Sequence, residues 1–113
     1  MRGPSFHYDS EWIVLDESFT YYSSRYGKYI YLEKGFKSDG ATGAFDIHSI
    51  AYLVHDKLCD TGVFEDGTIC SNWKASMILS DILRRDGFYI RKYTWFIATW
   101  FFGGGKARLN GMW

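Results

Sequence analysis

A histidine and an aspartate stand side by side in YLVHDKLCD, a largely apolar stretch that spans residues 52–60. Burying either side chain costs free energy unless a partner satisfies it. The pair is therefore either a structural hydrogen-bonding group or part of a reactive site. A neutral imidazole can take a proton from water, and a carboxylate can hold a hard cation. On this chemistry His55 is a candidate general base and Asp56 a candidate metal ligand.

Another carboxylate, Asp81, is placed to orient the histidine. The spacing of apolar residues predicts helices over 46–59 and 71–86, joined by a short connector. Helices joined in this way pack as antiparallel neighbours. His55 lies at the edge of the first apolar stripe and Asp81 at the flank of the second. We therefore expect Asp81 to hold one ring nitrogen of His55 and to leave the other free to act as a base.

Each candidate also has a structural interpretation. Asp81 could form a surface ion pair with Arg85, one turn on, or with Lys74 on the same face. His55 could be a histidine at the edge of the core that donates to a backbone carbonyl, and Asp39 could cap a turn. The sequence leaves these alternatives open.

Two metals suit the residues around this helix. The glycine-containing stretch Asp39–Gly43 could add a carboxylate and backbone carbonyls to Asp56, and calcium prefers such oxygen ligands. Zinc favours nitrogen and sulfur ligands. One face of the same helix carries His48, Tyr52, His55 and Cys59, of which the two histidines and the cysteine supply such atoms. His48 and His55 are two turns apart, so zinc would need further ligands. Calcium, with Asp56 and Asp39 as ligands, is the preferred hypothesis.

The composition narrows the class of protein. The chain has 113 residues, of which 47% are hydrophobic and 20% aromatic, and this excludes intrinsic disorder. The length indicates a single domain over residues 1–113. Thirteen basic residues balance thirteen acidic ones, so no nucleic-acid partner is expected.

The sequence has no recognisable membrane span or secretion signal, and this bears on the expected compartment of the protein and on the redox state of its cysteines. No stretch reaches the roughly 18 to 20 apolar residues that span a bilayer. The N-terminal MRGPSFHYDSEW has no apolar core typical of a secretion signal. We therefore expect synthesis in a cytosol without export by the usual route. In that compartment Cys59 and Cys70 are expected to be free thiols.

The predicted fold is α+β: a small antiparallel β-sheet or hairpin followed by three α-helices, with the His-Asp helix packed on an antiparallel second helix. Tyrosine, isoleucine and valine dominate the first part of the chain, and SSRYG at Ser23–Gly27 supplies a turn. Asp46 and Ser71 or Asn72 are the expected N-caps of the first two helices. The expected elements are strands in 11–37, helices over 46–59, 71–86 and 89–102, and a C-terminal arm over 103–113.

The helix predicted over 89–102 is apolar almost all round. Such a helix is either buried in a core or lies against another apolar surface. Tryptophan is enriched at membrane interfaces, and aromatic residues are enriched at protein interfaces. We predict that the segment from Trp95 to Trp113 contacts another chain or a membrane. If it forms an interface in a virion, the arm that follows the helix would become ordered only on a partner.

The candidate site resembles the active sites of secreted and parvoviral phospholipases A2. The resemblance rests on a helix that carries His-Asp, a preceding glycine-containing loop and an aspartate on the following helix, over residues 39–85. It implies that His55 activates water, that Asp56 holds calcium and that Asp81 orients His55. DGATG only thinly echoes the calcium loop of that family, and Cys59 stands where the family usually has a tyrosine.

A longer resemblance covers most of the chain. GFKSDGAT, YLVHDKLC, ASMILSDILRRDG and a tryptophan-rich segment that ends in FFGGG are similar to a family of short phage and prophage proteins of unknown function. That family reads G-F-x-T-D-x-A-S, H-D-x-L-Y and A-D-x-x-F at these places. It usually has a proline soon after the first motif, and this chain has none there. The resemblance implies a phage origin and highlights Asp39, His55, Asp56 and Asp81, but it supplies no activity.

Two functional hypotheses follow. The first is a tail-associated virion protein with a calcium-dependent, phospholipase A2-like hydrolase site that acts on the host envelope. The second is a purely structural virion assembly protein without catalysis. Both imply an oligomer whose partners are other virion proteins or envelope lipid, contacted through the aromatic helix and the C-terminal arm.

Overall fold

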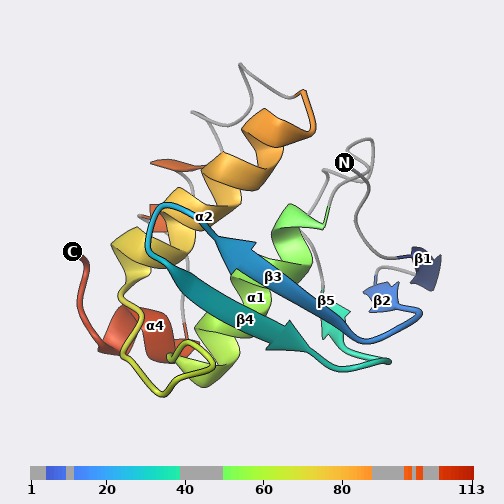
Figure 1. The fold of residues 1–113 in the computed structure, drawn as a ribbon, viewed down its shortest axis with the longest axis horizontal. Coiled ribbons are helices and arrows are strands. Elements are labelled where there is room, and N and C mark those ends of the chain that lie inside the picture. Colours follow the sequence, from blue (N-terminus) through green and yellow to red (C-terminus); the bar gives the residue numbers. More distant parts are fainter. Residues whose placement is uncertain (1–4, 10–11, 39–49, 88–95, 98, 101–104) are drawn as a thin grey trace.

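The computed structural model describes residues 5–9, 12–38, 50–87, 96–97, 99–100 and 105–113 (Figure 1). These residues form an α+β fold in which strands precede helices, as the sequence predicts. The strands are β1 (Phe6–Asp9), β2 (Trp12–Leu15), β3 (Phe19–Ser23), β4 (Lys28–Leu32) and β5 (Lys37–Ser38). The helices are α1 (Ala51–Thr61), α2 (Asn72–Arg85) and α4 (Gly105–Leu109).

Two antiparallel sheets are formed by the strands. The first has the order β1-β2-β5, and Phe6 lies opposite Leu15 in its register. The second is the hairpin β3–β4, in which Tyr21 lies opposite Ile30. Strand structure therefore begins at Phe6, earlier than the predicted residue 11. The first segment is short and has little strand pattern of its own, and its pairing with β2 stabilises it as a strand.

The hairpin β3–β4 has one face toward the core and one toward solvent. Ile30 and Leu32 are buried, whereas Tyr29 and Tyr31, which alternate with them, are about half exposed. This alternation is what the period of two in a strand produces. The predicted turn is confirmed, since β3 ends at Ser23 and β4 begins at Lys28.

Helix α1 lies at the centre of the molecule. It packs against α2, α4, β4 and β5, and Figure 1 shows it behind the hairpin with α2 alongside. The predicted stripe is confirmed where it is described, because Ile50, Ala51, Val54 and Leu58 are all buried. The described helix begins at Ala51 and ends at Thr61 rather than at residue 59. Its predicted start, including the N-cap Asp46, lies outside the described residues.

Helix α2 matches its prediction closely. The Ser71 hydroxyl accepts a hydrogen bond from the backbone N–H of Lys74, which confirms an N-cap at this position. The helix ends at Arg85, one residue before the predicted end. Its apolar stripe is fully buried and comprises Ala75, Ile78, Leu79, Ile82 and Leu83.

Residues 105–113, which include α4, pack onto α1 and α2 within the chain. The Asn110 amide donates to the carbonyls of Gly62 and Cys70, at 2.7 and 3.1 Å. The backbone N–H of Asn72 donates to Gly111. A Cβ at Gly62 would lie 2.8 Å from the Lys106 Cβ, so a glycine at the end of α1 permits this close approach.

The helix predicted over 89–102 is described only in part. Phe96, Ile97, Thr99 and Trp100 are helical, and the rest of the prediction lies outside the described residues. No helix in the part of the chain that the structure describes is long and apolar enough to cross a membrane.

Candidate functional site

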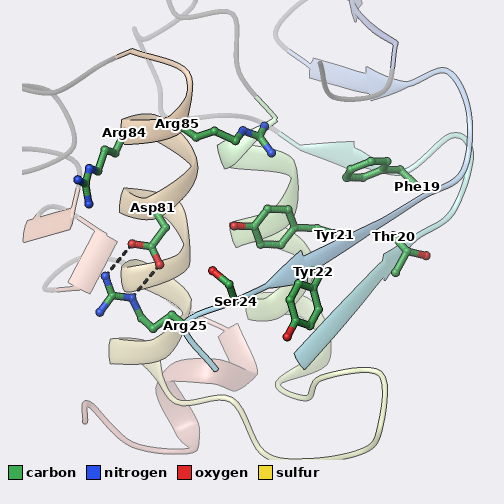
Figure 2. A pocket seen from close by; sticks show the side chains of 9 residues that line it. All are labelled: Phe19, Thr20, Tyr21, Tyr22, Ser24, Arg25, Asp81, Arg84 and Arg85. Atoms are coloured by element: carbon green, nitrogen blue, oxygen red, sulfur yellow. Dashed lines mark hydrogen bonds and ion pairs between the residues drawn. The ribbon is translucent and has the colours of Figure 1, made fainter. Parts of the chain in front are cut away.

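The structure does not bring Asp81 to His55. Asp81 instead accepts two hydrogen bonds from Arg25, with Oδ2 at 2.8 Å from Nε and Oδ1 at 2.8 Å from Nη2 (Figure 2). This two-point geometry matches the planar guanidinium fork to the carboxylate. Among the described residues the hydrogen-bonding and ion-pair partner of Asp81 is therefore Arg25, rather than His55 or the alternatives Arg85 and Lys74.

The position of Asp81 on α2 explains this result. Both helices bury an apolar stripe, but Asp81 lies at the side of α2 that faces the hairpin turn, where Arg25 stands. Arg85 binds its neighbour Asp86 instead, with Nε and Oδ1 3.2 Å apart. Burial raises the pKa of Tyr21, and the negative charge of Asp81 raises it further. The Asp81 carboxylate thus belongs to the interface between α2 and β3.

His55 and Asp56 form a different cluster, between α1 and β5. The Ser38 hydroxyl donates a short hydrogen bond to the Asp56 carboxylate. The Asp56 Oδ1 lies 3.6 Å from the His55 Nδ1, which is an ion-pair distance rather than that of a hydrogen bond. The Cys59 sulfur lies 3.7 Å from Nε2 and 3.8 Å from Nδ1 of the same ring. We call Ser38, His55, Asp56 and Cys59 the α1 polar cluster.

Burial and charge act in opposite directions on the imidazole. Only 5% of the His55 surface is exposed, and this burial acts to lower the pKa of its ring. The neighbouring Asp56 and Cys59 favour the charged form more strongly and raise the pKa to about 9. At neutral pH His55 is therefore an imidazolium that Asp56 stabilises.

The α1 polar cluster opens on a shallow groove of about 410 Å³. Asp56, Cys59 and Asp60 line it from α1, and Trp12, Phe36, Lys37 and Gly105 complete its walls. A ligand in this groove would meet two carboxylates, one thiol and one ammonium group. His55 itself lies beneath this surface.

The predicted calcium and zinc sites stay predictions, because expected ligands of both lie outside the described residues. No group of three or more histidine, cysteine, aspartate or glutamate side chains is arranged to hold a metal ion within the described ranges. Calcium takes six to eight oxygen ligands, and among the described residues that line the groove Asp56 and Asp60 supply carboxylates. Asp39, predicted as a calcium ligand, and His48, from the zinc alternative, both lie outside the described residues.

The two cysteines are free thiols in different environments. Cys59 is partly exposed beside His55, whereas Cys70 is fully buried. Burial raises the pKa of the Cys70 thiol to about 12, so this group stays neutral. Of the two sulfurs, only Cys59 reaches a surface groove.

A larger cavity, of about 990 Å³, lies between β3 and α2. Arg25 and Asp81 form part of its wall, together with Arg84 and Arg85 (Figure 2). The remaining wall comes from the strand and its turn and includes Phe19, Thr20, Tyr21, Tyr22 and Ser24. The sequence prediction did not find this cavity.

Sequence reasoning missed Arg25 and Ser38, the partners of the two aspartates. Arg25 lies 56 positions before Asp81 in a turn that carries no motif, so no local spacing connects them. Ser38 stands directly before Asp39 in the quoted motif SDGAT, and this adjacency was the one available signal. No protein-family model, curated protein or solved structure matches this chain.

Proposed function

We propose that this chain is a structural component of a phage virion, associated with the tail and made in the host cytoplasm. The phage origin rests on the resemblance of the motifs GFKSDGAT, YLVHDKLC and ASMILSDILRRDG to those of short phage and prophage proteins. The observation that carries the structural role is the separation of Asp81 from His55: Asp81 binds Arg25, and His55 lies buried against Asp56 and Cys59. The groups of the expected catalytic set therefore act in two separate structural contacts.

The protonation of His55 further favours this assignment. A general base must be neutral before it can take a proton from water. With a pKa of about 9, His55 already carries that proton at neutral pH. The ring then serves as the positive partner of Asp56, and Ser38 ties this carboxylate to β5.

The surface near the C-terminus supports contact with another chain. Leu109 is 85% and Trp113 is 77% exposed. The Trp113 ring packs on those of Trp73 and Trp100, with centroids 5.7 and 4.9 Å apart, so it is held in place rather than loose. Exposed aromatic residues on a fixed support are typical of protein interfaces. We propose that this C-terminal surface joins copies of the chain into an oligomer.

Sedimentation of the purified protein tests the oligomer. We expect a species larger than the 13.2 kDa monomer, and we expect Leu109→Ser with Trp113→Ser to shift it toward the monomer. The matched control replaces Tyr29 and Tyr31, exposed on the hairpin, with serine and should keep the oligomer. A wild-type protein that stays monomeric throughout a concentration series would contradict the proposal.

A second candidate function is the hydrolysis of envelope phospholipid. The groove favours it, because Asp56 and Asp60 line a surface next to His55, and because Ser38 leads directly into the predicted ligand Asp39. Fatty-acid release from phospholipid vesicles, measured with calcium and then with a chelator, tests it. Calcium-dependent release that His55→Ala abolishes would establish this function. Release no higher than that of His55→Ala in both conditions would exclude it.

A further inference from the structure

The 990 Å³ cavity follows the open edge of β3. Thr20 and Tyr22 point to one face of this strand and Phe19 and Tyr21 to the other, yet all four line the same cavity (Figure 2). Successive side chains of a strand point to opposite faces. A single cavity can touch both sets only where it runs along the strand edge. The space is thus a groove between that edge and α2, which we call the β3–α2 groove.

The backbone along this edge is available for pairing. β3 pairs with β4 on one side, and no further strand joins this sheet in the part of the chain that the structure describes. None of the backbone hydrogen bonds outside the ladder joins Phe19–Tyr22 to another described residue. In an antiparallel pair, alternate residues direct their N–H and C=O groups away from the partner strand. Such an edge is a template for an added strand.

The opposite wall carries positive charge. Asp81, Arg84 and Arg85 stand at spacings of three and four on α2 and line the groove together. With Arg25 the wall has three guanidinium groups and one carboxylate, a net charge of +2. Arg25 neutralises Asp81 through its two-point contact. Arg84 has no ion-pair partner among the described residues, and Arg85 has only Asp86.

We propose that the β3–α2 groove binds an extended acidic segment of a partner protein as an added β-strand. This inference deepens the proposed function, on which it rests for the protein nature of the partner. Main-chain hydrogen bonds to β3 would supply affinity, as they do where peptides extend an exposed sheet edge. Acidic side chains at every second position would face the arginines of α2, and the intervening side chains would lie on the outer face beside Tyr22. An edge strand alone would accept any peptide, and the arginines select an acidic one.

Titration of the ¹⁵N-labelled protein with a peptide of alternating threonine and glutamate tests the proposal. We expect backbone amide shifts along Phe19–Ser23, larger at alternate residues, and slower hydrogen exchange at the same positions. Arg84→Glu with Arg85→Glu should weaken binding by about tenfold or more, since charge-assisted hydrogen bonds are lost and repulsion is added. Lys34→Glu with Lys106→Glu makes the same change of net charge outside the groove and should leave the affinity within about twofold.

Two control peptides separate strand addition from simple attraction of charge. The same peptide with alternate backbone amides methylated cannot pair as a strand and should not bind. The peptide with lysine in place of glutamate should bind at least about tenfold more weakly than the acidic one. Equal binding of the methylated peptide, or an acidic peptide that leaves the β3 amides unshifted, would overturn the inference. Self-association is measured separately by sedimentation. An intact oligomer that binds no peptide would contradict only the proposal for the groove, and a monomer that binds the peptide would contradict only the proposed oligomer.

Discussion

Two aspartates on neighbouring helices have opposite surroundings in this molecule. Asp56 belongs to the α1 polar cluster, between a nearly buried imidazole and a buried serine. Asp81 stands at the rim of the β3–α2 groove and binds Arg25, whose side chain is 45% exposed. The sequence pattern predicts that both belong to one site. In the fold, Asp56 lies in a contact between α1 and β5, and Asp81 lies in a contact between α2 and the hairpin turn.

The two carboxylates are exposed to similar extents, 29% for Asp56 and 26% for Asp81, so the contrast lies in their partners, since His55 is 7% and Arg25 45% exposed. Removal of the buried partner of a charge lowers the free energy of unfolding by several kcal/mol, because the remaining charge is left without compensation. An exposed ion pair is screened by water and contributes about 0 to 1 kcal/mol. The α1 polar cluster should therefore stabilise the fold, and the Arg25–Asp81 pair should mainly shape a surface.

Removal of His55 should have the largest effect. His55→Ala leaves a cavity and removes the positive partner of Asp56, and we expect it to lower the free energy of unfolding by about 3 kcal/mol. Urea denaturation measures this loss. The matched control is His7→Ala, because His7 is 54% exposed and also contacts an aspartate, Asp16. Equal stabilities of the two variants would contradict the contrast.

The pH dependence of stability should show the same imidazole. The folded pKa of His55, about 9, lies above its ordinary value of 6.5. Its contribution is therefore complete below pH 6.5 and is lost as the pH rises through 9, in total about 3 kcal/mol. Urea denaturation at pH 6 and pH 9 should show this fall in wild type and not in His55→Gln. The Cys70 thiol lowers stability only above pH 9, its ordinary pKa, where the thiol ionises in the unfolded chain. In the folded chain its pKa is raised to about 12, so the buried thiol is still neutral there.

Loss of the hydroxyl at Ser38 should have an intermediate effect. Ser38→Ala removes a hydrogen bond to the partly buried Asp56 carboxylate, and we expect a loss of about 1 to 2 kcal/mol in the free energy of unfolding. Ser24→Ala is the matched control, because Ser24 is exposed in the hairpin turn. If Ser38→Ala lowered the free energy of unfolding no more than the control, the hydrogen bond between β5 and α1 would not stabilise the fold.

Breaking the Arg25–Asp81 pair should have the smallest effect. A double-mutant cycle with Arg25→Ala and Asp81→Asn should give a coupling energy below about 1 kcal/mol, because both side chains are partly exposed. Denaturation of the four proteins in urea provides the cycle. A coupling of 3 kcal/mol or more would place this pair on a level with the α1 polar cluster.

The sequence predicted those parts of the fold that depend on local pattern. The apolar stripe of α2, its cap at Ser71 and the turn at Ser23–Gly27 all follow from spacing and residue type. The antiparallel contact of α1 and α2 also followed. A short connector fixes which helices are neighbours, but not the rotation of each helix about its axis.

The candidate site was less predictable because its contacts are long-range. The partner of Asp81 comes from a turn 56 residues away, which no helical periodicity reveals. The docking of Asn110 on Gly62 and Cys70 similarly depends on a close approach between the last helix and the end of α1. Polar contacts between distant elements are set by packing, so adjacency in sequence predicted the His-Asp pair but not its partners.

The titration of His55 followed by NMR tests the central claim most directly. The account predicts that the ring is protonated at neutral pH, with a midpoint near 9. Asp81→Asn should leave the midpoint unchanged, because Asp81 binds Arg25. Asp56→Asn should lower it, because the neighbouring negative charge is removed. A midpoint at or below 6.5, or one that moves when Asp81 is changed, would contradict the account and return Asp81 to the side of His55.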